Sequence, residues 1–127
     1  MINSKFITDI LKLLLDGDKE GLMSKSQLDY LTELDYDYTD SGFYLSFKHQ
    51  NGIKNHRTDK MDLVLNGVKI ESNQLTSEAD VTLFFKNGLI DYLEIWSNDN
   101  NYPRYELTNY KLTQNWKDSS KKKIITE

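Results

Sequence analysis

Polar and apolar residues alternate in two neighbouring segments near the middle of the chain, 79–85 and 89–96. β-branched and aromatic side chains crowd both segments, and Lys86, Asn87 and Gly88 lie between them. An Asn-Gly pair between two apolar runs is typical of a β-hairpin. We therefore predict that residues 78–97 form the central hairpin of a sheet.

The register of this hairpin depends on its turn. A two-residue turn at Asn87 and Gly88 would pair Val81 with Glu94 and place a carboxylate on the apolar face. A three-residue loop that includes Lys86, with Gly88 as a bulge, pairs Val81 with Leu93 instead, so we predict that loop. The opposite face then carries Thr82, Phe84, Ile90, Tyr92, Glu94 and Trp96. Because a solvent-facing surface is rarely so aromatic, we expect either that a helix covers it or that it binds a partner.

The N-terminal third has helical periodicity. Apolar residues in segment 4–15 recur at the spacing of a helix with one buried stripe. Residues 16–21 predict a turn. A second helix is predicted from Lys25 to about Glu33, because Ser24 and Gln27 have the spacing of a capping box.

Further strands are predicted by alternation on both sides of the central hairpin. Segments 34–38 and 43–48 indicate a second hairpin, and segment 62–71 indicates a third that turns at Asn66 and Gly67. Residues 49–60 are polar and predict a long loop. Residues 105–112 fit either a last strand or a short helix. The charged end, 117–127, is expected to fray, although Ile124 and Ile125 suit an edge strand.

These elements predict one α+β domain over residues 1–127, a length that can bury a core of its own. We expect two N-terminal helices packed on an antiparallel, hairpin-built sheet of five to seven strands. The reason is that the predicted strands follow the helices and do not alternate with them.

Charge and composition narrow the choice of partners. The net charge is −4, and residues 1–40 hold nine of the twenty acidic residues but four of the sixteen basic ones. Such a surface disfavours nucleic acid and attracts basic proteins, although a solvated helical face explains the same acidity. Cysteine is absent, nothing in residues 1–5 resembles a signal peptide, and no apolar run is long enough to cross a membrane. We therefore expect a cytoplasmic protein.

Candidate chemistry is sparse. The chain has no cysteine nucleophile, no nucleophile-elbow motif and no zinc-protease motif, and its six glycines stand apart at predicted turns. Residues 16–27 resemble the calcium loop of EF-hand proteins, but Gln27 takes the position of the bidentate carboxylate. His49 and His56 share a polar loop without a third ligand nearby in the sequence. We therefore predict no catalytic residue, no metal and no cofactor.

Several short motifs carry a family resemblance, and they comprise Tyr38 to Tyr44, Glu78 to Val81, Asn87 to Ile90 and Leu93 to Ile95. Together they resemble a set of small bacterial α+β proteins that includes immunity proteins of polymorphic or contact-dependent toxin systems. The resemblance spans about residues 30 to 112. It implies a protein that binds and neutralises a toxin domain, and it assigns no toxin contact to any residue.

The preferred interpretation is a non-catalytic binding protein of the immunity type. Its partner-binding residues would be the acids of segment 35–40 and the polar and aromatic residues of the hairpin, namely Asp35, Asp37, Asp40, Tyr92, Glu94 and Trp96. Trp116 is a further candidate anchor. One alternative is a small-molecule-binding or enzymatic domain that uses the aromatic face around Trp96 and Glu94. Another is a homodimer through the same face or a strand edge. Asp35, Asp37 and Asp40 could instead bind a metal ion together, or simply be exposed to solvent without a binding role.

Overall fold

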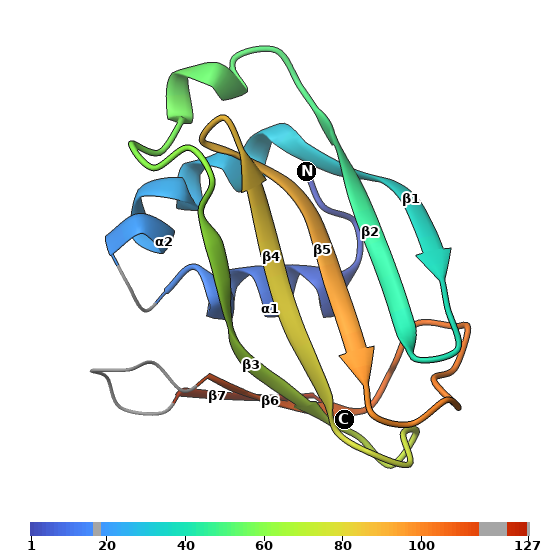
Figure 1. Ribbon diagram of the computed structural model, residues 1–127. Helices are drawn as coiled ribbons and strands as arrows, with labels where there is room; N and C mark the ends of the chain where they lie inside the picture. The colour runs from blue at the N-terminus through green and yellow to red at the C-terminus, as the bar shows by residue number, and fades with distance from the viewer. Residues whose placement is uncertain (17–18, 115–121, 127) are drawn as a thin grey trace.

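The computed structural model describes residues 1–16, 19–114 and 122–126 and has one antiparallel sheet with helices on one side (Figure 1). The sheet has seven strands in the order β1-β2-β5-β4-β3-β6-β7. The predicted α+β class is confirmed, because the helices precede the strands and pack on a single sheet. Of the C-terminal end that was expected to fray, residues 117–121 and 127 lie outside the described residues, as does Trp116.

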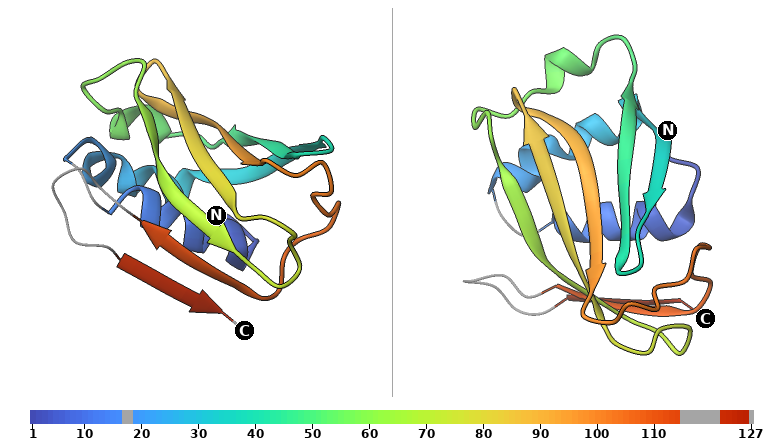
Figure 2. Two further views of the ribbon diagram at one scale, coloured as in Figure 1. Left: turned by 60° about the horizontal axis from the view of Figure 1, so that its bottom comes forward. Right: turned by 45° about the vertical axis from the view of Figure 1, so that its right-hand side comes forward.

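Helix α1 (Lys5–Leu14) forms where the apolar stripe predicts it. It begins at Ser4, whose hydroxyl accepts a hydrogen bond from the Ile7 amide at 3.1 Å and caps the first turn. The buried stripe lies beside β3, β6 and β7, where the sheet curls around the helix (Figure 2). Phe6 makes an edge contact with the Tyr110 ring at 4.8 Å between centroids. The helix therefore fills the concave side of the sheet.

The second predicted helix is placed too late in the sequence. Helix α2 (Lys19–Ser24) begins inside the predicted turn, the 3₁₀ helix η1 (Lys25–Tyr30) continues it, and strand β1 (Leu31–Tyr38) already starts at Leu31. Gln27 does not complete a capping box. Its fully buried amide bonds to backbone groups of His56, Gly88 and Ile90 instead. These tertiary contacts override the local helix signal.

The hairpin of β1 and β2 (Gly42–His49) is confirmed, and so is the central hairpin of β4 (Ala79–Lys86) and β5 (Leu89–Ser97). Strand β2 includes His49, and the rest of the predicted loop, residues 50–60, contains the 3₁₀ helix η2 (Ile53–His56). The undecided segment at 105–112 ends in strand β6 (Tyr110–Gln114), and β7 (Lys122–Thr126) is an edge strand that includes Ile124 and Ile125. β2 also pairs with β5, which joins the two hairpins.

The third predicted hairpin is wrong. Strand β3 (Val64–Glu71) runs straight through Asn66 and Gly67 and pairs with β4 on one side and β6 on the other. Gly67 has a φ of 104°, and the register shifts between Asn66 and Val68. Glycine therefore forms a β-bulge here, whereas in a hairpin the same Asn-Gly pair forms the turn.

The predicted three-residue loop between β4 and β5 is also wrong. Lys86 pairs with Leu89, so Asn87 and Gly88 form a two-residue turn with φ values of 55° and 78°. A bulge then shifts the register, because Phe85 pairs with Ile90 but Phe84 pairs with Tyr92. The extra residue at 91 exchanges the faces on which the following side chains of β5 lie. Without it, Tyr92 would face the core, and Glu94 would lie opposite Val81 on the apolar face.

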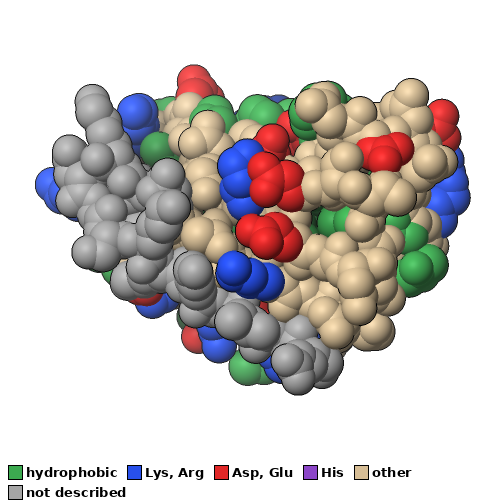
Figure 3. All heavy atoms as spheres, turned by 90° about the horizontal axis from the view of Figure 1, so that it is seen from below, with side chains coloured by type: hydrophobic (Ala, Val, Ile, Leu, Met, Phe, Trp, Pro, Cys, Tyr) green, Lys and Arg blue, Asp and Glu red, His purple; other side chains and the backbone are tan. Residues whose placement is uncertain are grey.

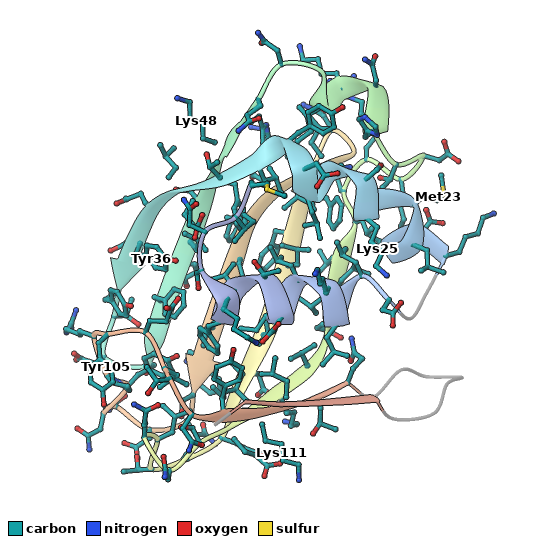
Figure 4. All side chains as sticks on the ribbon, turned by 180° about the vertical axis from the view of Figure 1, so that it is seen from behind. Met23, Lys25, Tyr36, Lys48, Tyr105 and Lys111 are labelled. Atoms are coloured by element: carbon teal, nitrogen blue, oxygen red, sulfur yellow. The ribbon has the colours of Figure 1, made fainter. Side chains whose placement is uncertain are left out.

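The two faces of the sheet differ. Helices α1 and α2 lie behind the sheet in Figure 1 and in front of it when the molecule is seen from behind (Figure 4). Fully buried side chains such as Leu45, Leu83 and Leu93 form the core on that side. No helix in the described part of the chain covers the opposite face, which we call the outer face. Within the same residues no helix has the length and apolarity of a membrane span.

Candidate functional site

The outer face carries cross-strand rows of side chains across its middle strands. Residues that pair across strands lie on the same face of a sheet, so the register defines each row. The first row runs Asp35, Ser46, Tyr92, Phe84, Val64, and the second runs Asp37, Tyr44, Glu94, Thr82, Asn66. A third row runs Trp96, Asp80, Lys69, Thr113. Aromatic rings and carboxylates therefore share one surface.

The rings of the first two rows are held in place by their neighbours. Tyr92 stacks on Phe84 with 4.5 Å between ring centroids and 14° between ring planes. Tyr44 lies 6.2 Å from Tyr92 at a tilt of 54°. The Tyr44 hydroxyl donates a hydrogen bond to the Glu94 carboxylate, and this bond, with the negative charge of Glu94, raises the pKa of Tyr44. Yet 41% of Tyr44 stays exposed, so the pair is fixed without being covered.

A hollow of about 430 Å³ opens beside these rings where β1, β2 and β5 lie next to one another. We call it the acidic hollow, and its lining consists of Asp35, Asp37, Tyr44, Ser46, Asp91 and Tyr92. The β5 bulge supplies Asp91, the residue left without a cross-strand partner. Among the described residues, none of the three aspartates forms an ion pair. The hollow is therefore a concentration of unneutralised negative charge beside fixed aromatic rings.

Trp96 lies further along β5 and is 46% exposed. It borders a second hollow of about 400 Å³, whose acids are already neutralised. Lys69 lies 2.6 Å from the Asp80 carboxylate and 3.6 Å from that of Glu78. Seen from below, acidic and basic side chains likewise lie next to one another (Figure 3). Mixed charge at this end contrasts with the uncompensated acids of the acidic hollow.

The structure brings together five of the six predicted partner-binding residues. Asp35, Asp37, Tyr92, Glu94 and Trp96 all lie on the outer face. The tyrosines that alternate with the two aspartates, including the labelled Tyr36, lie on the helix side of β1 (Figure 4). The alternation of β1 therefore assigns the faces of this strand correctly.

Asp40 is the exception. It lies in the turn between β1 and β2, where its carboxylate accepts a hydrogen bond from the Arg104 guanidinium at 3.2 Å. Arg104 also donates to the Tyr38 carbonyl at 3.3 Å. Asp40 therefore fastens the loop after β5 to the β1–β2 turn and does not line the acidic hollow.

Three residues that line the acidic hollow, Tyr44, Ser46 and Asp91, are not among the predicted partner-binding residues. Tyr44 shows only the alternation of an ordinary strand, whereas Asp91 interrupts the apolar run of segment 89–95. That interruption is the available signal, because a charged residue that breaks an apolar pattern is a candidate for a bulge. Tyr44 joins the site through the pairing of β2 with β5, which local sequence does not encode.

The remaining candidate ligands are dispersed. His49 donates from Nε2 to the Ile90 carbonyl at 2.6 Å, while His56 Nδ1 lies 2.8 Å from the Ser26 hydroxyl. Asp16 pairs with Lys25 at 3.1 Å, and the next two residues of the calcium-like loop lie outside the described residues. No group of three His, Asp or Glu side chains in the described ranges is close enough to hold a metal ion.

The outer face with its acidic hollow is thus the candidate site. Comparisons with models of protein families, with curated proteins and with solved structures find no match to this chain.

Proposed function

We propose that this is a non-catalytic, cytoplasmic immunity-type protein that binds a basic toxin domain on its outer face and blocks it. One observation carries the proposal. An uncovered sheet face holds exposed aromatic side chains and unpaired carboxylates next to one another, in rows set by the strand register. Large exposed aromatic patches on a sheet commonly mark interaction surfaces.

The aromatic residues supply the anchors of such an interface. Tyrosine and tryptophan at the centre of protein interfaces often contribute about 2 kcal/mol or more each when they become fully desolvated. Tyr92 is already locked against Phe84, and Tyr44 against Glu94. Because these rings lose little rotational freedom on binding, the entropy cost of docking a partner on them is small.

The carboxylates orient the partner and accelerate its association. Asp35 and Asp37 are exposed and unpaired, so a basic partner gains new ion pairs without first breaking existing ones. Opposite charges across an interface accelerate association more than they strengthen the final complex. The same charges disfavour a homodimer on this face, because a two-fold interface would bring like carboxylates together.

The alternative function, an enzyme or a small-molecule-binding domain, has less support. Glu94, the polar group that such a site would use to orient its ligand, is only partly buried and is already bonded to Tyr44. Its carboxylate therefore holds a ring in place. This role fits a preformed contact surface better than a reacting site.

The test is neutralisation in growing cells. The C-terminal domain encoded by the gene immediately upstream is expressed from an inducible promoter, with and without this protein. We expect growth arrest without the protein and rescue with it. The double variant Asp35→Lys with Asp37→Lys should lose the rescue, because two attractive contacts become repulsive.

The matched control is Asp59→Lys with Asp62→Lys, which changes net charge equally at exposed positions away from the acidic hollow. It should rescue growth as the unmodified protein does. Equal rescue by both double variants would contradict a role for the outer face. An upstream domain that does not arrest growth, or whose arrest the protein does not relieve, would contradict the immunity function itself.

A further inference from the structure

The shape of the acidic hollow indicates which side chain of the partner it takes. Three strands contribute its walls, with Asp35 and Asp37 from β1, Tyr44 from β2, and Asp91 and Tyr92 from β5. Neighbouring strands are about 4.8 Å apart, and residues i and i+2 of one strand are about 7 Å apart. The carboxylates therefore surround a space wide enough for a side-chain head group.

A metal ion does not fit this arrangement. A calcium ion needs six to eight oxygen ligands, each at about 2.3–2.6 Å, so several carboxylates must converge on one point. The aspartates of the hollow are not gathered closely enough in the described structure to form such a group. Aromatic rings, moreover, supply no oxygen ligands in the required number. The occupant must be a cation of greater extent.

The rings favour a flat cation. Tyr92 stacks on Phe84, and the tilted ring of Tyr44 lies 6.2 Å from the ring of Tyr92. The two tyrosine rings that line the hollow are therefore held in place. A guanidinium group is planar, stacks on aromatic faces, and donates hydrogen bonds in its plane to carboxylates on more than one side. A lysine ammonium group is a compact charge with no flat face to stack on the rings, and it is more strongly hydrated.

We propose that the acidic hollow takes an arginine side chain of the protein partner, with the guanidinium against Tyr44 and Tyr92 and its N–H groups directed to Asp35, Asp37 and Asp91. This inference rests on the proposed function, because it names the group by which the basic partner is recognised. Charge complementarity supports it, since none of the three aspartates forms an ion pair with a described cation.

The probe is a short peptide, so that the test does not need the partner. Acetyl-Gly-Arg-Gly-amide is titrated into isotope-labelled protein and followed by amide chemical shifts, beside the same peptide with lysine or with uncharged citrulline. We expect saturable shifts at Asp35, Tyr44, Asp91 and Tyr92, with a dissociation constant on the order of millimolar for one anchored residue. Arginine should bind at least about fivefold more tightly than lysine, and citrulline should not bind.

Variants separate the contributions of charge and ring. Asp91→Asn should weaken arginine binding about fivefold or more through loss of a charged acceptor, while Asp59→Asn should leave it unchanged. Tyr44→Leu should remove the preference for arginine over lysine, and Tyr44→Phe, which keeps the ring, should retain it. Unchanged amide dispersion in each variant confirms that the fold is intact.

Equal binding of arginine and lysine, shifts confined to other surfaces, or no shifts at all would overturn the arginine assignment. These outcomes are distinguishable from failure of the proposed function. If Asp35→Lys with Asp37→Lys still abolishes growth rescue while the arginine peptide does not bind, the outer face neutralises a toxin by other contacts. If the peptide binds but the upstream domain is not neutralised, the hollow recognises arginine in a different kind of partner.

Discussion

Replacing Gln27 by leucine should destabilise the protein and loosen the part of β5 that forms the site. Gln27 is fully buried. Its amide nitrogen donates to the carbonyls of His56 at 2.9 Å and Gly88 at 3.0 Å, and its amide oxygen accepts from the Ile90 N–H at 2.8 Å. Ile90 directly precedes the bulge residue Asp91. Gln27→Leu keeps the approximate volume and removes all three hydrogen bonds.

The size of the effect follows from which groups lose a partner. The Gly88 carbonyl still accepts from the Thr58 amide at 3.0 Å, so it stays satisfied. The Ile90 N–H loses its acceptor and the His56 carbonyl loses a donor. A buried polar group without a partner costs about 1–3 kcal/mol, so we expect the free energy of unfolding to fall by about 3 kcal/mol.

The assay is urea unfolding with tryptophan fluorescence, together with amide hydrogen exchange. The control is Gln50→Leu, at an exposed position whose backbone N–H bonds to the Tyr30 carbonyl and would remain in place. It should change the free energy of unfolding by less than about 0.5 kcal/mol. The Ile90 amide should exchange faster in Gln27→Leu. A loss below about 1 kcal/mol, or unchanged exchange at Ile90, would refute the reasoning.

Two further changes test contacts that support the outer face. The Glu33 carboxylate accepts hydrogen bonds from the amides of Asn3 and Ser4; burial alone would raise its pKa, but these bonds bring the pKa below the ordinary value of 4.5. Glu33→Gln should therefore lower the free energy of unfolding at pH 7 by about 0.5–1 kcal/mol, allowing for solvent screening. The stabilisation is complete above pH 4.5 and disappears as the pH falls through the lowered pKa, so the urea unfolding curves of the two proteins should converge as the medium becomes more acidic; a difference that stays constant or grows with falling pH would contradict this sign. Gly42→Ala should cost about 3 kcal/mol or more in a thermal or urea melt, because a methyl group there would lie 1.8 Å from the Ile95 carbonyl oxygen and push β2 from β5. An alanine tolerated at Gly42 without loss would show that these strands are not in close contact.

The sequence predicts those parts of the fold whose burial pattern is local. Helix α1 buries one stripe, and strands β2, β4 and the part of β5 after the bulge alternate between more and less buried side chains, so their periodicity identifies them. Strand β1 alternates in its sequence, although most of its residues are exposed or half-buried. The acids at 35 and 37 and the polar and aromatic residues at 92, 94 and 96 are on the outer face for the same reason. The sequence pattern alone also shows that this face is unusually aromatic. That no described helix covers it is known only from the structure.

What the sequence does not predict depends on bulges and on contacts between distant segments. The same Asn-Gly pair makes a turn at Gly88 and a bulge at Gly67, and only the neighbouring strands decide between the two. The bulge at Asp91 and the pairing of β2 with β5 place Asp91 and Tyr44 in one hollow. Gln27 does not cap a helix, because its side chain bonds to backbone groups that lie 29 to 63 residues away in the sequence.

The most direct test of the central claim, that the outer face recognises a basic partner, is the association rate with the upstream-encoded domain in stopped-flow fluorescence. At low salt, Asp35→Lys with Asp37→Lys should reduce the association rate constant about tenfold or more, with a smaller rise in the dissociation rate. Added salt should bring its association rate constant closer to that of the unmodified protein, because screening removes attraction and repulsion alike. An association rate constant that is the same for both proteins at low salt would contradict the account.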